Sequence, residues 1–115
     1  MKVYKFGGAS IKNANGIKNV VKILKKFGTD DVLIIVSATG KTTNSLEKVV
    51  KDYIEKSDNL KKSLAKVLMD HIEITRALFG DNSKSFSKII IDLIKKLENF
   101  LITNKSENYN FIYDQ

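Results

Sequence analysis

The sequence predicts an α/β fold in which a mainly parallel sheet is followed by a helical insert. Two short apolar stretches, residues 2–6 and 32–36, have the length and composition of strands. The segment between them carries apolar residues at the spacing of one helical face. A strand, a helix and a second strand in so short a span form a β-α-β unit, whose two strands run parallel.

The first strand, residues 2–6, ends at Gly7-Gly8, because paired glycines interrupt regular structure. A helix is predicted from Ile17, and Gly28 follows it as a C-terminal cap. Its apolar face comprises Ile17, Val20, Val21, Leu24 and Phe27. The second strand, residues 32–36, is a continuous apolar run, so we expect both of its faces to be covered, as in parallel sheets.

Three further helices are predicted, each with one apolar stripe and a charged back. The first begins near Asn44 or Ser45. The second runs from about Asn59 and stops at Gly80. The third begins near Ser83, which is expected to cap it.

These elements predict three successive parts: a β-α-β-α part at 1–58, a helical insert at 59–103, and the start of a next element at 104–115. In the last part, a polar loop at 104–110 precedes the apolar residues Phe111–Tyr113. A sheet of two strands leaves an apolar edge without a neighbour. We therefore expect the chain to be the front part of a larger α/β domain.

The composition is that of a globular protein, with 43% hydrophobic residues in a chain of 115. The absence of cysteine excludes disulfides and thiolate metal sites, and an intracellular, cytoplasmic location is expected. No signal peptide is recognisable, and no apolar stretch approaches the ~20 residues that cross a bilayer. A membrane is therefore not an expected partner.

The net charge of +7 raises the question of nucleic-acid binding. Nearly all of this charge is lysine scattered over the polar faces of the predicted helices, and Arg76 is the only arginine. Proteins that read bases usually use arginine together with exposed aromatic residues. The sequence therefore predicts no nucleic-acid partner, although a basic helical binding module without catalysis stays an alternative.

Two loops follow the strands, at the sheet edge where open α/β folds bind ligands. In the first, Lys5 offers a compact positive charge, and Gly7 and Gly8 let backbone amides approach a phosphate. Ser10 can bond to the phosphate or cap the turn that follows. The alternative is a plain strand-to-loop transition with a solvated lysine.

The second loop, residues 37–44, contains a GKT sequence that is suggestive of a P-loop. A P-loop needs another glycine five positions before Gly40, and that position is Ile35. A hydroxyl-rich loop before a helix N-terminus suits an anion such as a carboxylate. The alternative is that Thr43 and Asn44 merely cap the helix.

The lone histidine, His71, lies on the apolar stripe of its helix near Asp70 and Glu73. A packed structural histidine is favoured over a catalytic base or metal ligand. The acidic residues are dispersed, so no metal site is predicted.

Together the two loops resemble one family. KFGGAS at the start is similar to the KFGG-[TS]-S opening of aspartate kinases, in the amino acid kinase superfamily, and VSATGKTTN is similar to their second loop. The resemblance implies a three-layer α/β/α sandwich of which this chain is the N-terminal portion. It also implies ATP-dependent phosphorylation of the L-aspartate β-carboxylate to 4-phospho-L-aspartate, the first step toward lysine, threonine and methionine.

The resemblance also implies roles for individual residues. Lys5 would neutralise charge on the transferring phosphoryl group, Gly7 and Gly8 would donate amides to it, and Ser10 would support the turn. In the second loop two residues serve the substrate. Ser37 would lie near the reacting carboxylate, and Thr43 would bind aspartate.

The sequence departs from the family at Ala9, where threonine is usual, and Arg76 does not match the aspartate-binding arginine. The family continues beyond a stretch like Asp114-Gln115 into a motif with a substrate-binding glutamate. The isolated chain is therefore expected to lack kinase activity.

The expected ligands of the full-length enzyme are L-aspartate and ATP with Mg2+, and a homo-oligomer is expected. Alternatives within the superfamily are kinases of acetylglutamate, glutamate, carbamate or a nucleotide. The residues leave open the feedback inhibitor, a fused homoserine dehydrogenase domain, whether residue 115 is a native end, and the oligomeric state of the chain alone.

Overall fold

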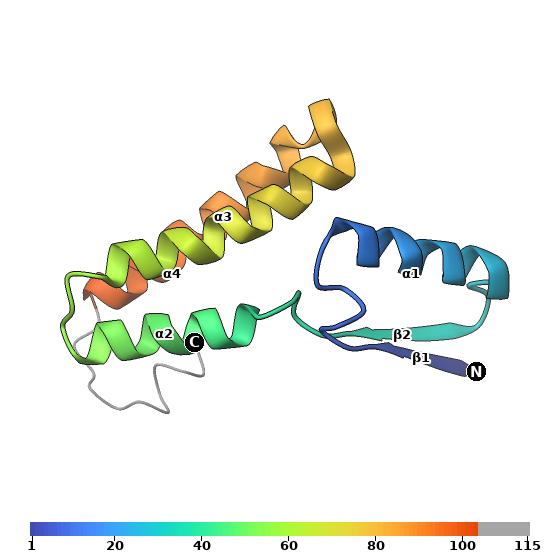
Figure 1. Cartoon of the computed structure of the whole chain (residues 1–115), viewed down its shortest axis with the longest axis horizontal. Helices are drawn as coiled ribbons and strands as arrows, with labels where there is room; N and C mark the ends of the chain where they lie inside the picture. Colours follow the sequence, from blue (N-terminus) through green and yellow to red (C-terminus); the bar gives the residue numbers. More distant parts are fainter. Residues whose placement is uncertain (104–115) are drawn as a thin grey trace. The chain divides into compact units, whose positions relative to one another are not determined.

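The computed structural model describes residues 1–103 and confirms the α/β class, with a parallel pair of strands and four α-helices (Figure 1). In chain order the elements are β1 (Lys2–Phe6), α1 (Ala14–Phe27), β2 (Val32–Val36), α2 (Thr42–Ile54), α3 (Leu60–Phe79), the 3-10 helix η1 (Gly80–Asn82) and α4 (Lys84–Thr103). The chain forms two compact units, Met1–Thr42 and a second that begins at Thr43. The predicted loop and apolar element after residue 103 lie outside the described residues.

The two strands of the first unit run parallel, with Lys2 opposite Val32 and Phe6 opposite Val36. Exposure alternates along β1: Tyr4 and Phe6 are half-buried, whereas Val3 and Lys5 on the other face are exposed. This alternation indicates that α1, which runs beside the sheet, covers the face of Tyr4 and Phe6 (Figure 1).

The opposite face of the sheet is open in the described residues, where Val3, Leu33 and Ile35 are 49, 46 and 44% exposed. The expectation that both faces of the second strand are covered is therefore not met within residues 1–103. The physical reason is that the first unit contains a single helix, which leaves one face of the sheet open and covers the other only in part, since Ile34 and Val36 on that face are 39 and 59% exposed.

Helix α1 begins at Ala14, earlier than the predicted Ile17, because Asn13 caps it. Asn13 has an extended backbone, and its side-chain oxygen accepts a hydrogen bond from the Gly16 amide at 2.9 Å. The end of the helix agrees with the prediction. Gly28, with a φ of 85°, donates its amide to the Leu24 carbonyl at 2.8 Å.

The second unit is a helical assembly with its own apolar core. Helices α3 and α4 lie side by side as a hairpin whose tip is η1 (Figure 1). The buried core residues come from α2, α3 and α4: Val49, Val50, Leu64, Val67 and Leu101. The predicted apolar stripes thus meet one another in this unit.

Helix α2 carries a buried charge in this unit. Asp52 is 4% exposed, and the Lys48 ammonium lies 3.0 Å from its carboxylate. The pKa of Asp52 is lowered, chiefly because Lys48 hydrogen-bonds the carboxylate; burial opposes the shift, and the Ser63 hydroxyl on α3 adds to it. The ionised carboxylate therefore stabilises the fold at any pH above the pKa of Asp in the unfolded chain, about 3.9. This stabilisation is lost as the pH falls through the lower pKa of the folded state.

We expect Asp52→Asn to lower the melting temperature at neutral pH and to reduce the loss of stability on acidification below about pH 4, the unfolded pKa of Asp. Asp70→Asn is the matched control, because Lys66 and Asp70 form the same type of pair at 2.9 Å with the carboxylate 48% exposed. Thermal unfolding followed by circular dichroism across the acid range measures both variants. Equal effects of the two substitutions would contradict this role of Asp52.

Candidate phosphate and substrate site

The two loops of interest leave the sheet at the same edge. Lys5 is the next-to-last residue of β1, and Ser37 follows the last residue of β2. The Ser37 amide donates to the Phe6 carbonyl at 3.0 Å, which extends the pairing of the strands by one bond. Both loops therefore begin at adjacent points of the sheet.

The first loop turns directly after β1 and lies against the second loop. The Ser10 amide donates to the Gly7 carbonyl at 3.0 Å and closes the turn. A Cβ atom placed on Gly8 would lie 3.3 Å from the Gly40 carbonyl oxygen, 3.5 Å from that of Ala38 and 3.8 Å from Ser37 Oγ. Only glycine permits so close an approach without moving a backbone.

Gly7 differs from Gly8 in its surroundings. No heavy atom lies within 4 Å of the position that a Cβ on Gly7 would occupy, so this backbone faces open space. Lys5 is exposed at the end of β1, on the open face of the sheet. Bare backbone and a lysine at one strand end fit a phosphate group, which prefers amide donors and a compact positive charge.

The conformation of the second loop depends on Gly40, for which the sequence predicts no structural role. Its φ is 51°, in the left-handed region, and a Cβ there would lie 3.2 Å from the Lys12 carbonyl oxygen. The Thr42 amide and hydroxyl both bond to the Thr39 carbonyl, at 3.1 and 2.5 Å. The loop thus packs on the turn that precedes α1, and its sequence gave no signal of this contact beyond the glycine itself.

These bonds start α2 at Thr42, so the prediction of a start near Asn44 or Ser45 is corrected. Thr43 and Asn44 lie within the helix and do not cap it. Thr43 is exposed and is the first residue of the second unit, so the contacts described for Met1–Thr42 do not include it. The structure brings Gly8 and Ser37 together, with Gly7 next to Gly8 in the chain; it does not place Thr43 among them.

His71 is held within its own helix. Its Nδ1 lies 2.7 Å from the Val67 carbonyl oxygen, and the Thr75 hydroxyl donates to the His71 carbonyl at 2.8 Å. The ring is half-buried in α3. These contacts support the interpretation of His71 as a structural residue.

Within residues 1–103, no three or more His, Cys, Asp or Glu side chains gather where they could hold a metal ion. The described residues therefore offer no carboxylate cluster for the Mg2+ that the resemblance implies. Helices long and apolar enough to cross a membrane are also absent from this part of the chain.

We expect Gly40→Ala to destabilise the first unit by roughly 1–2 kcal/mol, because alanine pays a steric cost in the left-handed region. Gly7→Ala is the control, since its Cβ would meet nothing within 4 Å and its backbone has no positive φ. Urea unfolding followed through the amide signals of β1 and α1 reports on this unit alone. A Gly40→Ala protein as stable as Gly7→Ala would show that the loop relaxes freely.

Comparison with known proteins gives a consistent result. A family model described as "Amino acid kinase family" matches residues 1–104. Aspartokinase 1, chloroplastic, from Arabidopsis thaliana is 33% identical over 104 residues, which cover 86% of this chain and 17% of the relative. The bifunctional aspartokinase/homoserine dehydrogenase 2, chloroplastic, of the same plant is 29% identical over 100 residues, covering 86% and 11%.

A bacterial relative, the bifunctional aspartokinase/homoserine dehydrogenase of Buchnera aphidicola, is 36% identical over 61 residues, covering 52% of this chain and 8% of the relative. The chain thus spans between 8 and 17% of the length of these three relatives.

Proposed function

Since the chain belongs to the amino acid kinase family, we propose that it forms the phosphate-binding side and part of the substrate side of an aspartate kinase. The reaction is the ATP-dependent phosphorylation of the L-aspartate β-carboxylate to 4-phospho-L-aspartate. The observation that carries the proposal is the approach of Gly8 to the Ser37–Gly40 loop at the end of two parallel strands. This approach supports the proposal that both motifs contribute to one site.

The proposed step is an in-line transfer. A β-carboxylate oxygen of aspartate bonds to the γ-phosphorus, the bond from that phosphorus to the bridging oxygen breaks, and ADP leaves with the electron pair. ATP supplies the phosphoryl group. The protein's task in such a transfer is positioning and charge stabilisation, without a covalent nucleophile.

Lys5 performs the charge stabilisation in this proposal. Its ammonium group, on the exposed end of β1, lies against the transferring phosphoryl oxygens and offsets their charge. The Gly7 and Gly8 amides donate to the same oxygens, and the open space beside Gly7 supports this role. Ser10 holds the turn through its amide bond to the Gly7 carbonyl.

The second loop binds the phosphoryl acceptor, L-aspartate, in this proposal. Ser37, whose hydroxyl is near Gly8, orients the reacting carboxylate, and Thr43 at the start of α2 binds aspartate through its exposed hydroxyl. The proposal assigns no described residue to the adenine or to Mg2+. The cytoplasmic location and the homo-oligomer stay predictions, since the plant relatives are named chloroplastic.

A substrate panel on the complete enzyme tests the function. Formation of an acyl phosphate, trapped as the hydroxamate, is expected with L-aspartate and ATP. Glutamate, acetylglutamate, carbamate and a nucleoside monophosphate are the alternatives within the family. Turnover of one of these in place of aspartate would keep the family and overturn the proposed substrate.

A further inference from the structure

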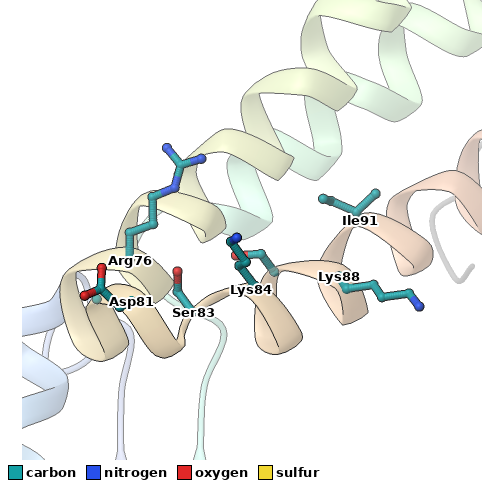
Figure 2. Close-up of a pocket in the computed structure, with 8 residues that line it drawn as sticks. Arg76, Asp81, Ser83, Lys84, Lys88 and Ile91 are labelled. Carbon is teal, nitrogen blue, oxygen red and sulfur yellow. The ribbon is translucent and has the colours of Figure 1, made fainter.

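A hollow of about 790 Å³ lies at the tip of the α3–α4 hairpin, within the second unit (Figure 2). Its lining includes Arg76 from the end of α3, Asp81 from η1, and Ser83, Lys84, Lys88 and Ile91 at the start of α4. At this tip the rings of Phe79 and Phe86 stack on each other, with their centroids 4.2 Å apart. None of these residues has a role in the proposed kinase site.

Ser83 is an unusual feature of this hollow. The residue is 8% exposed, and the structure shows no hydrogen bond of its hydroxyl to any described residue. Among the described residues no fully hidden polar side-chain atom lacks a partner, so the Ser83 oxygen keeps some exposure to solvent, and Ser83 is one of the residues that line the hollow. Figure 2 shows this oxygen pointing from the start of α4 toward α3.

The expected capping by Ser83 is also corrected here. Its backbone is helical, with φ −76° and ψ −16°, whereas a capping side chain needs an extended backbone to fold back on the amides. The first helical bond runs from the Ser87 amide to the Ser83 carbonyl at 2.8 Å. The amides of residues 84–86 therefore begin α4 without helical acceptors, and no acidic residue lies in this first turn.

The charges around the hollow favour an anion. The lining contains three basic residues, Arg76, Lys84 and Lys88, and one acidic residue, Asp81, so positive charge is in excess. No ion pair joins Asp81 to any of the three in the described part of the chain. The N-terminal end of α4 adds the positive pole of a 20-residue helix. Arg76, the only arginine of the sequence, brings a planar set of donors suited to oxyanions.

We propose that this hollow binds a phosphate group. In this proposal the phosphate is bound by the Ser83 hydroxyl, by the amide and ammonium of Lys84 and by the Arg76 guanidinium, since all three residues line the hollow. A tetrahedral dianion can accept from all of them, whereas a planar carboxylate has one charge and two oxygens. Ile91 gives the hollow an apolar side that the organic part of a phosphate ester would contact.

A phosphate titration of the 115-residue chain, followed by amide chemical shifts in NMR, tests this site. Inorganic phosphate is expected to shift the amides of residues 83–87. Arg76→Gln and Ser83→Ala are each expected to weaken this response about tenfold or more, the loss typical of one hydrogen bond to a charged group. The same titration with phenyl phosphate identifies the source of the phosphate group. Tighter binding of phenyl phosphate than of inorganic phosphate indicates a phosphate ester that contacts Ile91, whereas equal affinities indicate free phosphate.

Lys95→Gln is the matched control, because Lys95 is an exposed lysine of α4 away from the hollow. This variant is expected to keep the affinity of the unmodified chain, and circular dichroism verifies that every variant is folded. Arg76 is exposed, so Arg76→Gln tests the site even if Ser83→Ala unfolds the hairpin. Absence of shifts at residues 83–87, an equal loss in Lys95→Gln, or equal affinity for acetate would overturn the proposal.

Discussion

Replacing Lys5 by alanine is expected to lower kcat of the complete enzyme, proposed to be an aspartate kinase, by about 10²–10³-fold, with little change in KM for aspartate. The reason is that the proposed interaction strengthens as charge develops on the transferring phosphoryl group. An interaction made mainly in the transition state affects kcat and kcat/KM together. Steady-state kinetics with aspartate and ATP varied separately gives both parameters.

Two variants make this experiment specific. Lys2→Ala removes an exposed lysine from the other end of the same strand, and it is expected to leave kcat unchanged. Lys5→Arg keeps the charge with a different shape, so it is expected to recover part of the lost rate. An unchanged kcat in Lys5→Ala, or an equal fall in Lys2→Ala, would remove Lys5 from the chemistry.

Replacing Gly8 by valine is expected to lower kcat about 10²-fold and to destabilise the first unit by about 1–3 kcal/mol. The added carbon atoms would meet the Gly40 and Ala38 carbonyl oxygens, which lie 3.3 and 3.5 Å from the Cβ position. The two loops must then separate, and the phosphate side of the site moves away from the carboxylate side.

Kinetics of the complete enzyme and urea unfolding of the chain measure these two effects. Gly7→Ala is the control for stability, because its Cβ would face open space. It is expected to be as stable as the unmodified chain. A Gly8→Val enzyme with normal kcat would show that the close approach of the loops is not required.

The strands and most helix ends could be predicted from the sequence because local signals determine them. Residues 2–6 and 32–36 are bounded by glycine and polar residues, and both strands have the predicted limits. Gly28 and Gly80, which carry positive φ angles, end α1 and α3 as predicted. The pairing of the two glycine-containing loops also follows, since parallel strands present their carboxyl ends at one edge.

Other features depend on contacts between distant residues, and no local signal announces them. The start of α2 is set by Thr39 and by the packing of Gly40 on Lys12. Asp52 is buried in the unit where α2, α3 and α4 share an apolar core, which its own segment does not reveal. The residue type of Ser83 predicts a cap, whereas its helical backbone angles show that it is not one.

The most direct test of the proposed phosphate site is an ATP titration of the 115-residue chain, with amide chemical shifts measured for the unmodified chain and for Lys5→Ala. We expect ATP to shift the Gly7 and Gly8 amides, and we expect Lys5→Ala to weaken this response while leaving any response at residues 83–87 unchanged. ATP shifts that are absent from Gly7 and Gly8, or that persist fully in Lys5→Ala, would contradict the assignment of this loop to the phosphate side of a kinase site.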